Sequence, residues 1–167
     1  MGVVMNPDNI REEMLRRLMT QYKNDLMRMS CAFLRDPALA EDAVQETFIK
    51  AYQAMTMFRG DSSEKTWLMR IAINTCRNIR RDAWFRYVDR SITPDILPLQ
   101  AASDKDRALL GAVMSLPYRH KEVVLLYYYQ GLNLQEISDT LGVAASTVST
   151  RLKKARERLH IELKGGV

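Results

Sequence analysis

The sequence predicts an all-α protein of two small helical domains, the second a helix-turn-helix, joined by a flexible linker. Three observations favour this class. Apolar residues recur at spacings of three and four along most of the chain, as in helices that bury one face. The β-branched residues are scattered and no Asn-Gly or Asp-Gly turn occurs, so no strand pattern competes. Residues 89–103 contain two prolines and no helical period. We therefore expect one domain at residues 10–88, the linker at 89–103 and the second domain at 104–164.

Three helices are expected in the first domain. The earliest spans roughly residues 10–34. The Asp36-Pro37 pair is typical of the start of a second helix, because Asp caps free backbone N–H groups and Pro fits the first turn. Asp61 and Glu64 have the spacing of a capping box, which predicts a third helix over residues 62–85.

The second domain is expected to begin with two further helices. Ser103 and Asp106 have capping spacing and open the first, which ends near Ser115. The second is expected to span Pro117–Gln130, with an apolar face that includes consecutive valines and leucines. Gly131 is typical of the residue that ends such a helix.

The C-terminal part of the chain has the pattern of a helix-turn-helix. Asn133 and Glu136 form a capping box for a short helix over Leu134–Leu141. A tight turn at Gly142-Val143 follows, and then a longer helix over Ala145–Leu163. A short helix, a glycine turn and a longer helix are the parts of the DNA-binding motif.

The outer face of this longer helix begins with hydroxyl and basic side chains. They are Ser146, Thr147, Ser149, Thr150, Arg151, Lys153 and Lys154. Such residues suit a helix that lies in the major groove, where the first residues contact base edges and the cations hold phosphates. An ordinary helical hairpin with a polar outer face is the alternative.

Composition limits the other classes of protein. The 167 residues are 47% hydrophobic, as in a globular chain, and their net charge of +5 permits a polyanionic partner. The longest apolar stretch, Val123–Tyr129, is far shorter than the roughly 18 residues that a membrane span needs. The first five residues are too few for the core of a signal peptide. We expect a soluble, cytoplasmic protein with no membrane insertion.

The two cysteines, Cys31 and Cys76, lie far apart among apolar residues and have no neighbouring His. This arrangement is not that of a zinc site. We expect buried free thiols and no metal or other cofactor, with a redox switch as the alternative.

Charge is distributed in three blocks. Residues 70–90 and 147–158 are basic, and residues 36–49 contain four acidic side chains and no basic one. Charge runs usually form solvated helix faces, but here each basic block accompanies a helix with a binding pattern.

Four stretches of the chain have recognisable motifs. They are residues 36–48 (DPALAEDAVQETF), residues 58–68, residues 115–126, and residues 131–142 with 147–159. Together they resemble the extracytoplasmic-function group of bacterial RNA polymerase sigma factors. Residues 36–48 are similar to the segment by which these factors bind the polymerase clamp. Residues 58–68, FRGDSSEKTWL, resemble the segment that opens and reads the −10 element, and residues 115–126 resemble the start of region four. Residues 131–142 and 147–159 resemble its helix-turn-helix. The resemblance implies a region 2 helical bundle, a region 4 helix-turn-helix, and core RNA polymerase, promoter DNA and an anti-sigma factor as partners.

The resemblance also implies roles for individual residues. The positions that match the polymerase-binding motif are Asp42, Gln45, Glu46 and Phe48. The −10 element would be contacted by Phe58, Gly60, Asp61, Ser62, Ser63, Arg70, Asn74, Arg77, Asn78 and Arg81. The −35 element would be contacted by the hydroxyl and basic residues of the last helix. Trp67 has the spacing of a core residue, and we expect it in the core.

Two departures from the family pattern affect the −35 contacts. Residues 144–146, Ala-Ala-Ser, replace a frequent Pro-x-Gly, and Ser149 replaces a frequent basic residue. The basic contact is therefore expected to move to Arg151, Lys153 and Lys154.

No enzyme motif competes with this interpretation, because the sequence contains no phosphate-binding loop, zinc-binding HExxH or nucleophile elbow. We expect neither catalysis nor a small-molecule substrate. A free-standing helix-turn-helix regulator with a helical sensor or dimerisation domain is one alternative. A helical adaptor that binds only protein is another.

Overall fold

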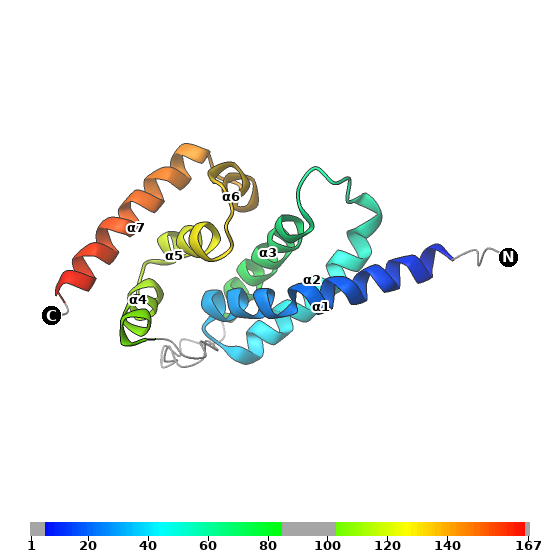
Figure 1. The fold of residues 1–167 in the computed structure, drawn as a ribbon, viewed down its shortest axis with the longest axis horizontal. Helices are drawn as coiled ribbons and strands as arrows, with labels where there is room; N and C mark the ends of the chain where they lie inside the picture. Colours follow the sequence, from blue (N-terminus) through cyan, green and yellow to red (C-terminus); the bar gives the residue numbers. More distant parts are fainter. Residues whose placement is uncertain (1–5, 85–102, 166–167) are drawn as a thin grey trace. The chain divides into compact units, whose positions relative to one another are not determined.

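The computed structural model describes residues 6–84 and 103–165, and all regular structure in these two ranges is helical. The predicted all-α class is confirmed. The chain divides into two units, unit 1 over Met1–Tyr87 and unit 2 over Val88–Val167, and each is described by itself (Figure 1). None of the described helices has a stretch long and apolar enough to span a membrane.

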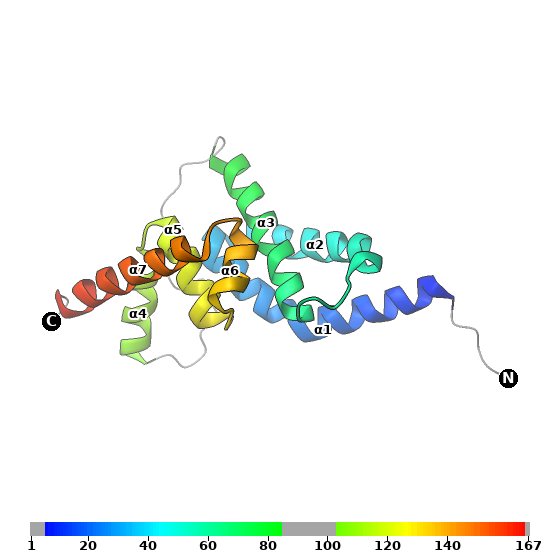
Figure 2. The ribbon, with the colours of Figure 1, turned by 90° about the horizontal axis from the view of Figure 1, so that it is seen from above.

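The described part of unit 1 contains three long helices that pack against one another (Figures 1 and 2). They are α1 (Pro7–Leu34), α2 (Pro37–Ala54) and α3 (Glu64–Trp84), with a short 3-10 turn, η1 (Met55–Met57), after α2. The predicted cap of α2 is confirmed, since the Asp36 side chain accepts hydrogen bonds from the backbone N–H groups of Ala38 and Leu39. Arg35 joins α1 to α2 in a left-handed conformation, with φ of 54°.

The predicted capping box at the start of α3 is wrong. The Oγ of Ser63 accepts a hydrogen bond from the backbone N–H of Thr66 at 3.1 Å, so α3 starts two residues later than expected. Glu64, which was expected to complete the box, instead pairs with Arg17 of α1. An ion pair with a distant helix therefore takes the place of the expected local hydrogen bond of Glu64.

The core of unit 1 is mainly aliphatic. Its fully buried side chains include Leu18, Leu26, Leu68, Met69 and Ile73, each 0% exposed. The two cysteines are buried free thiols, as predicted. Burial raises the pKa of the Cys76 thiol to about 11, although a hydrogen bond with the Ser30 hydroxyl acts in the opposite direction.

In its described residues, unit 2 has four helices and a π turn, with the long helix α7 packed against α4, α5 and α6. Two of the four, α4 (Asp104–Met114) and α6 (Leu134–Leu141), begin with the predicted capping boxes, and both boxes are confirmed. The last, α7, covers Ala145–Gly165. Its buried residues Val148, Leu152 and Ala155 form the apolar side of the helix.

The predicted helix over Pro117–Gln130 is interrupted. The α-helical part, α5, covers Tyr118–Val124, and a π turn, η3, follows over Leu125–Tyr129. The backbone N–H of Gln130 donates to the carbonyl of Leu125 at 3.1 Å, five residues back. This wider turn keeps the leucines buried while two tyrosines, Tyr128 and Tyr129, stay about half exposed.

Candidate nucleic-acid interface and partner-binding face

The helix-turn-helix is stabilised by hydrogen bonds between its own residues. The backbone N–H of Glu136 donates to Asn133 Oδ1, and the backbone N–H of Asn133 donates to Glu136 Oε2, both at 2.8 Å. Gly142 ends α6 with φ of 67°, a conformation that favours glycine. The Ser138 hydroxyl donates to the carbonyl of Val143 at 2.6 Å and thereby fixes the turn before α7. The entry angle of α7 is thus set locally.

The start of α7 presents most of the predicted DNA-contacting residues to solvent. Exposed side chains are those of Ser146, Ser149, Thr150, Lys153 and Lys154, and Thr147 is half-buried. The Thr150 hydroxyl donates to the carbonyl of Ser146, one turn earlier. A face of hydroxyl and ammonium groups therefore lies opposite the buried face of the same helix.

Arg151 departs from this pattern, because its guanidinium turns inward. Its Nη1 lies 3.7 Å from Oε1 of Glu122 on α5, and its side chain is only 17% exposed. Glu122 is 1% exposed, so this ion pair belongs to the interior of unit 2. The prediction that Arg151 is a free basic contact is weakened, and Lys153 and Lys154 are left as the exposed cations of this turn.

A hollow of about 370 Å³ lies between α5 and the start of α7. Its lining residues are Arg119, His120, Ser146, Thr147, Thr150, Arg151 and Lys154. Arg119 and His120 were not predicted from the sequence, because the spacing along α5 does not reveal which residues face α7. Burial lowers the pKa of His120, and nearby cations of α7, first Arg158 and then Lys154 and Arg151, add to the effect.

The predicted polymerase-binding residues share one side of α2, with one exception. Asp42 and Gln45 are exposed, and Glu46 has a half-exposed carboxylate. Lys50 donates to Glu46 Oε1 at 2.8 Å and to the hydroxyl of Thr75 on α3 at 3.2 Å. The exposed carboxylates are therefore attached to a helix that is itself tied to α3.

Phe48 is the exception on α2. It is 4% exposed and forms part of the unit 1 core, because it lies beside Val44 and Ala51 on the buried side of α2. The structure therefore gives it a packing role, in place of the predicted direct contact with a partner.

The loop before α3 combines an aromatic pair with small polar residues. The rings of Phe58 and Trp67 lie 4.8 Å apart, and both side chains are half-buried. Trp67 is thus a boundary residue that stacks on the loop, and the expectation of a core position is wrong. Gly60 adopts φ of 78°, and it and Asp61 are exposed.

Two further serines complete this loop. Ser62 is half-buried, while Ser63 is exposed and its hydroxyl caps α3. The hydroxyl of Ser63 is therefore already engaged in the structure, whereas Gly60 and Asp61 are exposed.

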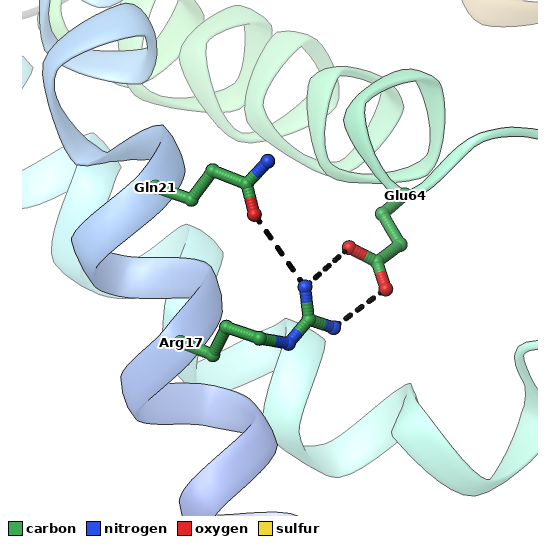
Figure 3. A network of polar contacts seen from close by, with 3 residues as sticks. All are labelled: Arg17, Gln21 and Glu64. Carbon is green, nitrogen blue, oxygen red and sulfur yellow. Dashed lines mark hydrogen bonds and ion pairs between the residues drawn. The ribbon is translucent and has the colours of Figure 1, made fainter.

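Arg17 connects this loop region to α1. Its Nη1 and Nη2 donate to the two carboxylate oxygens of Glu64 at 3.0 and 2.6 Å, and Nη1 also approaches Gln21 Oε1 at 3.4 Å (Figure 3). The hydrogen bond from Arg17 holds the pKa of Glu64 below its ordinary value. Bidentate pairing of this kind fixes orientation as well as distance. Sequence reasoning missed Arg17, because no local signal links residues 47 positions apart.

The polar side of α3 carries the remaining predicted residues at spacings of three and four. Asn74, Asn78 and Arg81 are exposed, and Arg70 and Arg77 are half-buried. Arg81 donates to Asn78 Oδ1 at 3.3 Å. The opposite side of α3 enters the core through Leu68, Ala72 and Cys76. The structure therefore brings these five residues onto one face of α3.

An all-helical unit followed by a helix-turn-helix unit defines a multi-domain DNA-binding protein, and comparison with known proteins makes the class specific. Residues 18–86 match the family described as Sigma-70 region 2, and residues 112–160 match Sigma-70, region 4. The chain belongs to the sigma-70 family of RNA polymerase sigma factors and is of the extracytoplasmic-function type. The predicted family is confirmed. A free-standing regulator does not account for the match over residues 18–86.

Similar proteins cover nearly the whole chain. The ECF RNA polymerase sigma factor SigL of Mycobacterium tuberculosis is 33% identical over 158 residues, which are 90% of this chain and 89% of that protein. The RNA polymerase sigma-H factor of Pseudomonas aeruginosa is 30% identical over 158 residues, 85% of this chain and 82% of that protein. The structure of the sigma factor RpoE in complex with the anti-sigma factor NepR from Bartonella quintana has the same fold, with a TM-score of 0.73, 24% identity and coverage of 93% and 99%.

Proposed function

We propose that this sigma factor binds core RNA polymerase through the exposed side of α2, contacts the −10 element with residues 58–63 and α3, and contacts the −35 element with α7. The observation that carries the proposal is the separation of charge within the chain. The exposed side of α2 is acidic, whereas the exposed sides of α3 and of the start of α7 are polar and basic. Nucleic acid favours the second kind of surface and disfavours the first.

The contact with polymerase is assigned to Asp42, Gln45 and Glu46. Their side chains reach solvent together, and α2 is held to α3 through Lys50. An acidic face on a rigid helix suits a basic partner surface, because charge complementarity orients the encounter and raises its rate.

The contact with the −10 element is assigned to the loop and the polar side of α3. Unstacking a base costs a few kcal/mol unless a pocket receives it. The backbone and small side chains around Gly60 and Asp61 can surround such a base, and the ring pair of Phe58 and Trp67 closes one side of the loop. Arg70, Arg77 and Arg81 then follow the strand's phosphates, with Asn74 and Asn78 between them.

The contact with the −35 element is assigned to Ser146, Thr147, Ser149, Thr150, Lys153 and Lys154. The hydroxyls at the N-terminal end suit base edges and water-mediated contacts, and the two lysines suit phosphates. Arg151 supports this surface from within through Glu122.

Regulation by an anti-sigma factor is also part of the proposal. The similar sigma factor RpoE from Bartonella quintana was solved in complex with the anti-sigma factor NepR. A protein of that kind that covers the exposed side of α2 would compete with polymerase. The proposal places the chain in the cytoplasm, where a bacterial polymerase works, and assigns it no catalytic step.

The first test is co-purification with bacterial core polymerase, followed by transcription from a promoter library. We expect stable binding and new start sites preceded by a shared pair of −35 and −10 elements. DNA binding without polymerase binding would contradict the proposal and favour a free-standing regulator.

Paired variants then test the assignment of surfaces. Asp42→Ala with Gln45→Ala should weaken polymerase binding and leave binding to a −35 duplex intact, with Glu13→Ala on α1 as the exposed acidic control. Lys153→Ala or Lys154→Ala should do the reverse, with Lys164→Ala as the basic control. Each lysine that holds a phosphate should lower the magnitude of the salt slope by about 0.9. Unchanged polymerase affinity in the α2 double variant would overturn the α2 assignment.

A further inference from the structure

The hollow between α5 and α7 contains more cationic groups than the helix-turn-helix pattern alone supplies. Arg119 and Lys154 approach it from different helices, and the hydroxyls of Ser146 and Thr147 lie on its wall. Arg151 also lines it, but Glu122 largely offsets that charge. The net result is a concave, positively charged surface beside the residues that are proposed to contact DNA.

His120 is the one lining side chain whose charge can change near neutral pH. Its Nδ1 is buried and has no hydrogen-bond partner among the described residues. Arg151, Lys154 and Arg158 of α7 act on the ring, and Arg119, Lys121 and Glu122 are its neighbours along α5. Burial and the cations of α7 lower the pKa of His120, which favours the neutral imidazole in the free protein.

We propose that this hollow holds one backbone phosphate of the −35 duplex and that His120 takes up a proton from solvent as the phosphate enters. The proposal rests on the proposed function, because it requires α7 to lie in the major groove. It adds Arg119 and His120 of α5 to the interface and makes DNA binding by this chain dependent on pH.

The direction of the effect follows from the charges. A phosphate in the hollow offsets the cations that disfavour the imidazolium and adds a favourable partner for it, so the pKa of His120 rises on binding. Affinity for DNA therefore increases as the pH falls through the pKa of the bound state, and it levels off below the pKa of the free state. Each unit of difference between the two pKa values corresponds to about a tenfold change in affinity.

The chain provides its own control, because it contains only two histidines. His160 lies exposed on α7, outside the hollow. The imidazole signals of the full chain can be titrated by NMR, with and without a 20-base-pair duplex of mixed sequence at low salt. Phosphate contacts do not depend on sequence, so the promoter need not be known. We expect the pKa of His120 to rise by about one unit on binding, and the signals of His160 serve as the internal control.

Affinity measurements give a second readout. The dissociation constant of the wild type should fall as the pH is lowered from 8 to 5.5, by up to about tenfold. His120→Gln should remove most of this dependence and match the wild type at pH 8, and His160→Gln should retain the dependence. Arg119→Ala should weaken binding at both pH values.

The outcomes distinguish failure of the phosphate site from failure of the −35 assignment. Equal pH profiles for the wild type and His120→Gln, or an unchanged pKa of His120 on saturation with duplex, would overturn the phosphate site alone. Failure of the wild type to bind any duplex would overturn both the site and the −35 assignment. If His120→Gln does not fold, the NMR titration of the wild type still decides the question.

Discussion

Unit 1 and unit 2 contain the same kind of secondary structure but obtain their stability in different ways. Unit 1 packs helices of 28, 18 and 21 residues around an aliphatic core. Unit 2 has a buried apolar core of its own, but α4, α5 and α6 have only 11, 7 and 8 residues, and capping boxes, a glycine turn and a buried ion pair add to that core. Short helices are only marginally stable on their own, so local hydrogen bonds contribute more to the stability of unit 2. Loss of a polar contact should therefore matter more in unit 2 than in unit 1.

The largest expected effect is that of a cavity in unit 1. Leu18→Ala should lower the free energy of unfolding by about 3 kcal/mol, because Leu18 is 0% exposed. Both tryptophans belong to unit 1, so the urea midpoint of tryptophan fluorescence measures this unit alone. Met19→Ala, at the adjacent and 38% exposed position, is the control and should cost far less. Equal costs at the two positions would mean that the core of unit 1 is not where the structure has it.

The second prediction concerns the ion pair of unit 2. Glu122→Ala should destabilise this unit by about 3 kcal/mol, because it leaves the largely buried guanidinium of Arg151 without its carboxylate. Circular dichroism should then show an early loss of helix that tryptophan fluorescence does not follow. Glu122→Leu combined with Arg151→Met should restore most of the stability. A cost of the single variant below 1 kcal/mol would remove the proposed contrast between the units.

The third prediction compares one helix N-cap in each unit. Asp36→Ala in unit 1 and Asn133→Ala in unit 2 should each cost about 1 kcal/mol. Only the second should also weaken duplex binding, because α6 orients α7. Asn133→Asp retains an oxygen at the cap and serves as the control. The measurements are urea denaturation and duplex affinity at one salt concentration.

The smallest effect is expected at the exposed ion pair of unit 1. Arg17→Met should cost about 0.5 kcal/mol at pH 7, since exposed pairs contribute little. The folded pKa of Glu64 lies below its unfolded value, so this contribution is present above pH 4.5 and is lost as the pH falls through the folded pKa.

Urea midpoints at pH 7 and pH 3.5 test that pH dependence. The difference between wild type and Arg17→Met should shrink at the lower pH. Arg16→Met, which removes a neighbouring cation that is 79% exposed, should show no such change. A constant difference across the two pH values would show that Arg17 acts through packing instead.

The same contrast explains which features the sequence could predict. The caps at Asp36, Ser103 and Asn133 were predicted correctly, because a cap and its partner lie within three residues of each other. The start of α3 was not, because Asp61 and Ser63 are both acceptable caps and only the distant Arg17 draws Glu64 away.

Site residues follow the same rule. The face of α7 was predictable from its helical period, whereas the inward turn of Arg151 depends on Glu122 of another helix. Phe48 was predicted to contact the polymerase but is buried, because a family motif includes core positions as well as surface ones. Arg119 and His120 join the site only because α5 and α7 cross, and no spacing along the chain encodes that crossing.

The π turn of unit 2 also determines where the chain can change length. In η3 the carbonyl of Leu125 accepts a hydrogen bond from the backbone N–H five residues later in the chain, that of Gln130. In an α-helix the donor would be the residue four positions later. Deletion of one residue from the run Tyr127–Tyr129 would convert this turn to α-helix and leave Gly131 and the following cap in register. Elsewhere in a helix a one-residue deletion rotates all later side chains by about 100°. We therefore expect relatives of this chain to differ in length by one residue at this point and still place α7 in the same way.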